Sequence, residues 1–433
     1  MASDARVLLW GSEIGAVSWI EERGIGVFQY TPDFVRSGIE VSPLEMPLRE
    51  IPYEFPDLGS SSFRGLPGLV ADSLPDAFGN ALIDEWLASE GRAPDSMDPV
   101  ERLCYTGTRG MGALEFQPAI LGPPSARRSL DIEKLIDLAQ KTLQHRANLG
   151  GVFRGEDDCE AIEDILRVGT SAGGARAKAV LAWNPRTGDF RSGQLPTNSG
   201  FEYWIMKFDG VCSQSPDTLG SPQGYGKVEY AYSLMASACG IRMSPCRLHH
   251  EGGRSHFMTR RFDRDDSGRK VHMQSLAALA HYDYQQPSRY SYEQAIHAIR
   301  RLGLPREDLE QQVLRAIFNV VARNQDDHVK NIAFLMDTKG RWRLSPAFDV
   351  TFATDPASRW MNQHQMSLNG KRTEIRQDDL VALANAAGIK APKAREMIER
   401  VLHAVGEWPD YAEGAGLDAT RAEQIENMHC TKL

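Results

Sequence analysis

Hydrophobic residues change their spacing along this chain. In the first hundred residues, Val7–Trp10 and Ala16–Ile20 form short apolar runs separated by glycine, which is typical of strands. The stretch Gly68–Leu87 predicts a helix that begins after Pro67, is interrupted at Pro75 and then continues. The first part of the chain is therefore expected to mix strands and helices.

The middle of the chain has strand-like apolar runs beside one clear helix. Strands are predicted at Val180–Trp183, Tyr203–Phe208 and His256–Arg264. Gly226–Ile241 predicts a helix that ends at Gly240, because glycine is common just past the C-terminus of a helix.

Helical spacing dominates from about residue 290 onward. Apolar positions from Leu309 to Val321 recur at steps of 4, 3, 1, 3 and 1, which is the pattern of an amphipathic helix. Residues 332–337 and 342–350 then predict two strands joined by a short turn. Asp378–Val405 predicts two more helices with a break near Gly388. The pattern predicts an α+β fold with a strand-rich N-terminal part and a mainly helical C-terminal lobe.

A linker rich in proline and serine at residues 121–131 marks the first predicted boundary, and a helix is expected to follow it. The second boundary is placed where strands give way to helices. We therefore expect three parts, at residues 1–124, 125–265 and 266–433.

Composition narrows the class of protein. The 433 residues are 42 % hydrophobic and 25 % charged, which excludes a disordered, collagen-like or coiled-coil chain. The formal net charge of −9 argues against a broad electrostatic grip on nucleic acid. Six cysteines without a CxxC pair argue against a disulfide framework or a zinc site. With no secretory leader pattern and no apolar run near the roughly 18 residues of a spanning helix, a soluble cytoplasmic protein is expected.

Several catalytic motifs are considered and set aside. Gly169–Gly173 matches the GxSxG pattern around Ser171, but here a helix-like stretch precedes the serine and a strand-like one follows, the reverse of a nucleophile elbow. Lys227 lacks the flanking residues of a phosphate-binding Walker loop. His249 and His250 are neighbours in sequence, so their side chains are not expected to share a metal ion.

One set of three polar residues remains a candidate for catalysis. Asp326 and Asn331 have the spacing of a kinase catalytic loop, in which an aspartate accepts the hydroxyl proton and an asparagine binds magnesium. Asp349 follows 18 residues after Asn331, beyond the second predicted strand, where a kinase places its other magnesium ligand. The alternative is a solvated loop with two adjacent aspartates and no catalytic role. The order of the three residues around a predicted strand pair favours phosphoryl transfer with Mg²⁺.

The strand-rich part offers partners for a nucleotide. Gly169–Lys178 is a loop of small residues whose backbone amides can approach phosphates. Lys207 ends a strand where a kinase places its phosphate lysine, and Glu229 on the next helix is expected to pair with it. The alternatives are a strand-end lysine that reaches solvent and a surface acid. The backbone of Arg260–Arg264 is a candidate adenine hinge that includes Phe262.

At these positions the chain resembles the HipA-like serine/threonine kinases, which are the toxins of HipBA-type toxin–antitoxin modules. The resemblance runs nearly end to end. Its most specific parts are Ser171-x-x-Gly174-x-x-x-Lys178, the segment NQDDHVKN at 324–331, and WRLSPAFD at 342–349. Gln325 stands where the family often has threonine. The resemblance implies a bilobal kinase-like fold whose N-terminal subdomain is 1–124, whose N-lobe is 125–265 and whose C-lobe is 266–433.

The resemblance also implies roles for single residues. Asp326 would be the catalytic base, with Asn331 and Asp349 binding Mg²⁺. Further residues would contact ATP or support the loops around it: Ser171, Gly173, Gly174, Ala175, Lys178, Lys207, Glu229, Arg260, Phe262, His328 and Lys330. In the family the loop serine, here Ser171, is autophosphorylated and the kinase is then switched off, because the added charge repels a phosphate-binding loop. Thr170 is a second possible acceptor, and a loop hydroxyl without a regulatory role is the alternative.

Partners follow from the same resemblance. We expect a separate helix-turn-helix antitoxin of the HipB type, a protein substrate such as an aminoacyl-tRNA synthetase, DNA contact only through the antitoxin, and no membrane. Two other functions stay open from the sequence. One is a small-molecule or lipid kinase on the same scaffold, because a scaffold does not fix the acceptor. The other is a non-catalytic nucleotide-binding co-regulator of a DNA-binding antitoxin.

Overall fold

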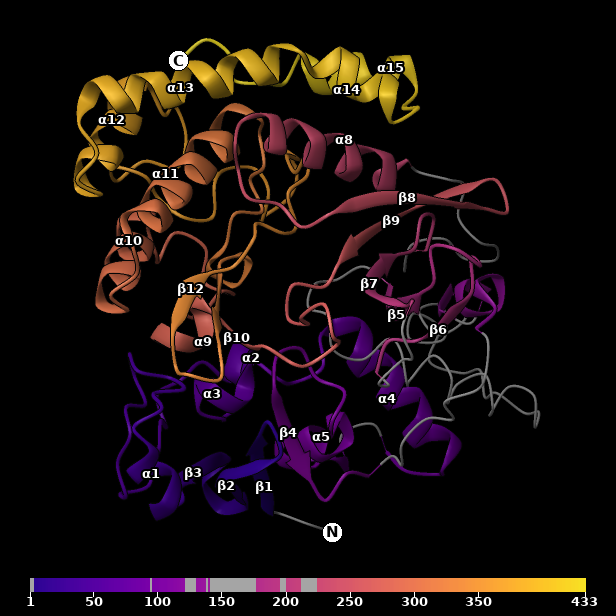
Figure 1. Cartoon of the computed structure of the whole chain (residues 1–433), viewed down its shortest axis with the longest axis vertical. Coiled ribbons are helices and arrows are strands. Elements are labelled where there is room, and N and C mark those ends of the chain that lie inside the picture. The colour runs from indigo at the N-terminus through magenta and orange to yellow at the C-terminus, as the bar shows by residue number, and fades with distance from the viewer. Residues whose placement is uncertain are drawn as a thin grey trace. The chain divides into compact units, whose positions relative to one another are not determined.

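The structure is a computed structural model that describes residues 4–93, 96–120, 130–137, 139–140, 177–194, 200–211 and 224–433 (Figure 1). The chain divides into two compact units. Unit 1 comprises residues 1–39, 48–226 and 247–273, and unit 2 comprises residues 40–47, 227–246 and 274–433. Nothing in this division tests the three predicted parts, whose boundaries stay a prediction.

Unit 1 begins with an antiparallel sheet of four strands in the order β3-β2-β1-β4. Its strands are β1 (Asp4–Leu9), β2 (Ser12–Ile20), β3 (Ile25–Tyr30) and β4 (Leu114–Gln117). Burial alternates along β1, so one face of this sheet is packed against the interior. The predicted strands at Val7–Trp10 and Ala16–Ile20 are confirmed, apart from Trp10, which turns out of β1 with φ 50°.

Six helices lie between β2 and β4 along the chain within the described residues. They are η1 (Glu21–Arg23), α1 (Pro32–Ser37), α2 (Ser60–Phe63), α3 (Gly68–Ala71), α4 (Ala77–Ser89) and α5 (Pro99–Thr106). The predicted interruption at Pro75 is confirmed, because α3 ends before it and α4 begins after it. Asp76 caps α4 by accepting a hydrogen bond from the Gly79 amide at 2.7 Å.

A second sheet in unit 1 has five strands in the order β6-β5-β7-β9-β8. Its strands are β5 (Lys178–Trp183), β6 (Phe190–Ser192), β7 (Glu202–Lys207), β8 (Cys246–Glu251) and β9 (Arg254–Arg260). The inward faces of β5 and β7 share a hydrophobic core with α4 and with the helical residues 132–137. The predicted strands at Val180–Trp183 and Tyr203–Phe208 are confirmed to within a few residues.

The predicted strand at His256–Arg264 is too long at its C-terminal end, because β9 stops at Arg260. Asp263 lies beyond it, fully buried, and accepts hydrogen bonds from Arg261, Arg264 and the Gly112 amide. The two guanidinium groups hold the pKa of the Asp263 carboxyl well below its ordinary value, against the opposing effect of burial. This buried polar cluster occupies the segment that was predicted to continue the strand.

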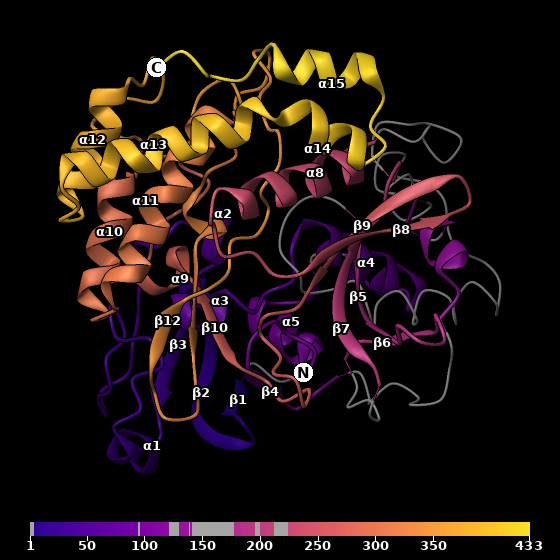
Figure 2. The same ribbon diagram turned by 45° about the horizontal axis from the view of Figure 1, so that its top comes forward.

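Unit 2 is mainly helical and carries one small sheet, β10-β11-β12 (Figure 2). Its elements are α8 (Tyr225–Ala238), β10 (His272–Ser275), α9 (Leu276–Ala280), α10 (Tyr292–Arg301), α11 (Arg306–Val321), η3 (Val329–Asn331), β11 (Ala333–Met336), β12 (Trp342–Leu344), α12 (Gln377–Ala386), α13 (Ala391–Gly406), α14 (Trp408–Gly414) and α15 (Ala419–Glu426). One apolar core runs through these helices, with α11 packed against both α12 and α13. The predicted helices at 226–241 and 309–321 and the pair at 378–405 are confirmed, whereas α14 and α15 were not predicted.

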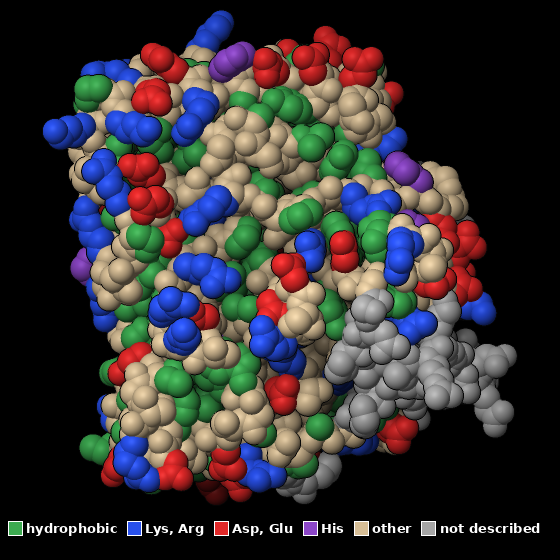
Figure 3. All heavy atoms as spheres, in the orientation of Figure 1, with side chains coloured by type: hydrophobic (Ala, Val, Ile, Leu, Met, Phe, Trp, Pro, Cys, Tyr) green, Lys and Arg blue, Asp and Glu red, His purple; other side chains and the backbone are tan. Residues whose placement is uncertain are grey.

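Two surface properties bear on the expectations from composition. Lys and Arg side chains are mixed with Asp and Glu over the face drawn in Figure 3, so this face carries no large field of one sign. Among the described helices, none combines the length and the apolar character needed to cross a bilayer.

Candidate functional site

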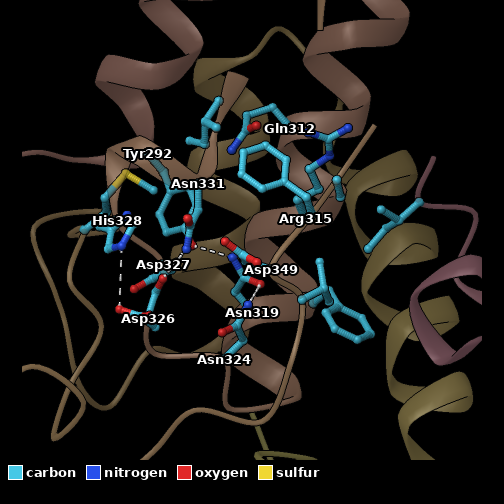
Figure 4. A pocket seen from close by; sticks show the side chains of 17 residues that line it. Tyr292, Gln312, Arg315, Asn319, Asn324, Asp326, Asp327, His328, Asn331 and Asp349 are labelled. Carbon is cyan, nitrogen blue, oxygen red and sulfur yellow. Dashed lines mark hydrogen bonds and ion pairs between the residues drawn. The ribbon is translucent and has the colours of Figure 1, made fainter. Parts of the chain in front are cut away.

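A pocket in unit 2 is lined by the two aspartates and the asparagine that the sequence analysis predicted, Asp326, Asp349 and Asn331 (Figure 4). The end of α11, the loop that follows it and the segment after β12 supply most of its walls. The other lining side chains come from Ile241, Tyr292, Gln312, Arg315, Phe318, Asn319, Asn324, Asp327, His328, Ile332, Ala347, Phe348, Val350 and Met366. Residues 23 positions apart in sequence therefore meet at one site.

Asp327 is the buried anchor of this site. Its side chain has no exposed surface. It accepts hydrogen bonds from the Tyr292 hydroxyl at 2.7 Å and from the backbone N–H of Gln365 at 2.7 Å. A third contact joins it to His364 Nδ1 at 2.8 Å. Burial and the nearby Asp327 carboxylate raise the pKa of the Tyr292 phenol well above its ordinary value, so Tyr292 keeps its proton and donates it. These bonds fix the backbone at the loop's centre.

Asp326, by contrast, is accessible. Its side chain is 46 % exposed, and Oδ1 accepts a hydrogen bond from Gln365 Nε2 at 2.7 Å. His328 Nε2 lies 3.8 Å from the same oxygen. Within the described residues, Oδ2 of Asp326 makes no hydrogen bond or ion pair, so a carboxylate oxygen is open to the pocket. A half-exposed carboxylate on a fixed loop is what a general base requires.

Asn331 lies at the end of the loop that begins at Asp326. It ends the short helix η3 (Val329–Asn331), and its Nδ2 donates to the Asp326 carbonyl at 2.9 Å. Because the amide nitrogen is used inward, the carboxamide oxygen of Asn331 is the atom left for a ligand. The spacing Asp326-x4-Asn331 thus has a geometric meaning, since it is the length of chain that this bond spans.

Asp349 is carried by a segment that is tied down on both sides. Before it, Ser345 bonds the Ala333 carbonyl through its amide, and Arg315 donates to the Ser345 carbonyl at 2.6 Å. After it, Ala353 forms a parallel bridge with Asn324, just before the loop that carries Asp326. Asp349 itself has φ 52°, in the left-handed region that residues other than glycine rarely adopt. Such strain is typical of functional positions that their surroundings hold in place.

Two further side chains of the loop share one aromatic neighbour. The His328 ring lies 5.6 Å from the Tyr284 ring, and Lys330 Nζ lies 4.9 Å from the centroid of the same ring. The second distance allows a cation–π contact. Among the described residues, Lys330 forms no ion pair with a carboxylate. Its charge is therefore not neutralised by a neighbouring acid.

Two of the residues predicted to bind phosphate, Lys178 and Lys207, lie at one end of the second sheet. Lys178 on β5 and Lys207 on β7 are directly opposite each other in the antiparallel ladder. Directly opposed residues place their side chains on the same face, where two like charges are unfavourable without an anion. Lys178 is buried, and its Nζ lies 3.0 Å from Asp76 Oδ2, whereas Lys207 Nζ lies 5.7 Å from the Phe257 ring centroid. The structure thus gives Lys178 a protein partner, and its predicted contact with phosphate stays a prediction.

The other predicted nucleotide contacts are placed as follows. Glu229 on α8 is buried, so the alternative of a surface acid is wrong. Arg260 at the end of β9 pairs with Asp266 at 3.0 Å, and Phe262 follows it in partly buried backbone. Ser171, Thr170, Gly173, Gly174 and Ala175 lie outside the described residues, so the phosphate loop and the autophosphorylation site stay predictions.

The donor set of the unit 2 pocket suits one class of metal ion. Asn331 and Asp349 offer a carboxamide and a carboxylate oxygen, which are hard ligands. Mg²⁺ is usually held by one or two carboxylates together with water and substrate phosphates, whereas a cage made of protein alone is uncommon for it. Among the described residues, no cluster of three His, Cys, Asp or Glu side chains could hold a metal by itself. The residues present therefore fit Mg²⁺ bound together with a nucleotide.

Comparison with family models assigns both parts of the chain. Residues 5–117 match the HipA N-terminal domain, and residues 170–408 match the HipA-like C-terminal domain. The second match alone covers more than half of the 433 residues. The chain belongs to the HipA family.

Relatives in this family are distant. Y4mE of Sinorhizobium fredii, a kinase by its name, is 26 % identical over 187 residues, which are 40 % of this chain and 43 % of that protein. The match therefore spans less than half of the length of that curated relative. The HipA structure from Shewanella oneidensis, solved with HipB and operator DNA, has a TM-score of 0.64 at 16 % identity and covers 98 % of this chain and 94 % of that one. At this identity the likeness establishes the HipA fold alone. The Helicobacter pylori kinase CtkA gives a TM-score of 0.35 at 13 % identity, covering 52 % of this chain and 85 % of that one, which is too low to support an argument.

Sequence reasoning missed three residues that hold the loop of Asp326 and Asp327 in unit 2, and one residue that pairs with Lys178 in unit 1. Tyr292, His364 and Gln365 contact the two aspartates from positions 35 to 39 residues away in sequence, and no local pattern marks them. Asp76 precedes a predicted helix, so its capping role has a sequence signal. Its ion pair with Lys178, 102 residues later, has none.

Proposed function

We propose that this HipA-family protein is an ATP- and Mg²⁺-dependent serine/threonine protein kinase and the toxin of a toxin–antitoxin module. The observation that carries the proposal is the pocket in which Asp326, Asn331 and Asp349 converge, with one carboxylate oxygen of Asp326 open. Phosphoryl transfer needs positioned groups and neutralised charge more than covalent chemistry from the protein. A base, two hard oxygen ligands and a lysine that, among the described residues, pairs with no carboxylate are the parts that such a site uses.

The roles follow from the environment of each side chain. Asp326 accepts the proton of the attacking serine or threonine hydroxyl as the new oxygen–phosphorus bond forms and the bond from the γ-phosphorus to the β-γ bridging oxygen breaks. Asn331 and Asp349 hold Mg²⁺, which neutralises the phosphate charge when bound. Lys330 supports the γ-phosphate from beside Tyr284. Lys207 contributes positive charge at the C-terminal end of β7, the central strand of the second sheet.

The proposed partner and substrate rest on family membership. The Shewanella oneidensis relative is a complex with HipB and operator DNA, which supports a separate HipB-like antitoxin for this chain and DNA contact through that antitoxin. The formal charge of −9 supports the same division of labour. A component of translation, such as an aminoacyl-tRNA synthetase, is the proposed substrate. Autophosphorylation of Ser171 is proposed as the means by which the kinase switches itself off.

The test compares wild type with Asp326→Asn and uses Asp378→Asn as a matched control, because Asp378 is an exposed aspartate in the first turn of α12. We expect Asp326→Asn to abolish transfer from labelled ATP to a panel of aminoacyl-tRNA synthetases while nucleotide binding stays within about twofold of wild type. Asp378→Asn should keep full activity. Intact-mass and peptide mapping of the same samples reports phosphate on Ser171 or Thr170. Equal transfer by Asp326→Asn and wild type would refute the proposal, and labelled metabolites in place of protein would indicate a small-molecule kinase.

A further inference from the structure

Gln365 is the residue that contacts both aspartates of the catalytic loop. Its backbone N–H donates to Asp327 Oδ1 at 2.7 Å, and its side-chain Nε2 donates to Asp326 Oδ1 at 2.7 Å. An ionised carboxylate can only accept hydrogen bonds, so the side-chain amide must present its NH₂ group to Asp326. The amide orientation is thereby fixed by chemistry.

The backbone of Gln365 has little freedom to move. Its N–H is held by the buried Asp327, which is itself held by Tyr292 and His364, and its carbonyl accepts from the Ser288 amide at 2.9 Å. The residue is only 4 % exposed. Within the described residues its Oε1 is buried without a hydrogen-bond partner, so the side chain gives up one polar contact in this orientation. A buried amide that leaves one atom unpartnered in order to place the other is unusual, because the unpaired atom costs about 1–3 kcal/mol.

The hydrogen bond from Gln365 makes the two carboxylate oxygens of Asp326 different from each other. Oδ1 is occupied by Gln365, with His328 Nε2 also nearest to it at 3.8 Å. Rotation of the carboxylate would exchange the two oxygens and would break the 2.7 Å bond. Oδ2 is therefore kept in one direction as the acceptor for the substrate proton. Orientation of this kind is worth a large part of a catalytic rate, since small misplacements reduce it by up to about 100-fold.

We propose that Gln365 is a positioning residue of this site, which fixes the Asp326 carboxylate so that Oδ2 alone receives the proton of the acceptor hydroxyl. The inference rests on the proposed kinase function and adds to it a residue from the segment beyond Asp349. Gln365 acts through Asp326 and needs no contact with the substrate.

The first measurement separates this role from a structural one. Gln365→Met keeps the length of the side chain and removes its donor, so we expect kcat for protein phosphorylation to fall about tenfold with the KM for ATP unchanged. Gln363→Met is the matched control, because Gln363 belongs to the same segment and, among the described residues, contacts neither aspartate. It should keep wild-type kcat. Thermal unfolding of both variants reports any general loss of folding.

The second measurement uses a variant whose donor depends on pH. In Gln365→Glu the introduced carboxyl faces Asp326, and two adjacent carboxylates share one proton as the pH falls. The shared proton restores a hydrogen bond between them, so the ratio of kcat for Gln365→Glu to kcat for Gln365→Met should rise at least threefold between pH 8 and pH 6. The neighbouring charged and titratable groups on both elements, namely Asp327, His328, His364, Tyr292 and Arg372, are the same residues in both variants.

A constant ratio over this range, or a kcat for Gln365→Met equal to wild type, would overturn the inference while leaving the kinase proposal intact. If Gln365→Met unfolds at assay temperature, the same pH series on Gln365→Glu against wild type decides between a positioning role and a structural one. A wild-type chain without phosphoryl transfer would overturn the proposed function first, and the inference with it.

Discussion

Asp327 offers the sharpest prediction about stability, because it is buried beside an aspartate that is not. Asp327→Ala removes a carboxylate with no exposed surface and leaves three donors without an acceptor: the Tyr292 hydroxyl, His364 Nδ1 and the Gln365 amide nitrogen. Each buried donor left unsatisfied costs about 1–3 kcal/mol, so the lower end of the sum is about 3 kcal/mol. Entry of water into the vacated space limits the upper end, and we expect a loss of about 3–5 kcal/mol.

Asp327→Asn should lose less, about 1–3 kcal/mol, because it keeps one acceptor oxygen and most of the volume. The assay is urea unfolding followed by tryptophan fluorescence, to which Trp408 in the core of unit 2 contributes, and by circular dichroism. With a slope of about 2–3 kcal/mol per molar urea, the alanine variant should shift the midpoint down by about 1–2.5 M. Asp378→Ala is the control, and its exposed position predicts a change of no more than about 1 kcal/mol. A midpoint for Asp327→Ala within about 0.3 M of wild type would refute the view of Asp327 as an anchor.

Two other predictions concern unit 1. Lys178→Met should destabilise unit 1 by about 3–5 kcal/mol by leaving Asp76 buried and unpaired, and the double variant with Asp76→Asn should recover part of that loss in a double-mutant cycle; simple additivity would argue against the pair. His256 Nδ1 accepts from the Asp209 amide at 3.0 Å, and burial lowers the pKa of His256 to about 4. Because the unfolded chain binds this proton from about pH 6.5 downward and the folded chain does not, stability should fall between about pH 6.5 and 4 at up to about 1.4 kcal/mol per unit. His256→Asn keeps an acceptor and should flatten that part of the urea–pH profile, whereas the exposed His250→Asn should not.

Periodic elements were predictable because their cause is local. The step pattern from Leu309 to Val321 reports one buried helix face, and α11 follows it. The break at Pro75 has a covalent cause, since proline cannot continue a helix interior. The end of β9 at Arg260 was not predictable, because it depends on Asp263 finding the Gly112 amide 151 residues earlier in the chain.

The candidate site divides along the same line. Asp326, Asn331 and Asp349 have a recognisable order in sequence, and the bond from Asn331 to the Asp326 carbonyl explains the spacing of the first two. The left-handed φ of Asp349 could not be read from its neighbours, because aspartate adopts it only when the surrounding segment enforces it. The contacts of Gln365 span 38 and 39 residues and come from an irregular segment without periodicity. Long-range polar contacts of this kind leave no trace in a hydrophobic pattern.

The adjacent aspartates show why a motif must be interpreted together with its burial. In sequence the two carboxylates are equivalent, yet one has three hydrogen-bond donors and no exposed surface, and the other is half exposed. A carboxylate that satisfies three buried donors stabilises the fold but has no lone pair directed at a substrate, whereas an accessible one on a mobile loop would lack direction. In this site the two aspartates are adjacent, and Gln365 forms a hydrogen bond with each of them. The fixed position of the buried Asp327 therefore limits the movement of the accessible Asp326. Weakening Asp327 should therefore reduce kcat through the orientation of Asp326 even where the chain stays folded. Asp327→Asn assayed well below its unfolding midpoint should therefore show a lower kcat with an unchanged KM for ATP, and full activity under those conditions would separate the two aspartates again.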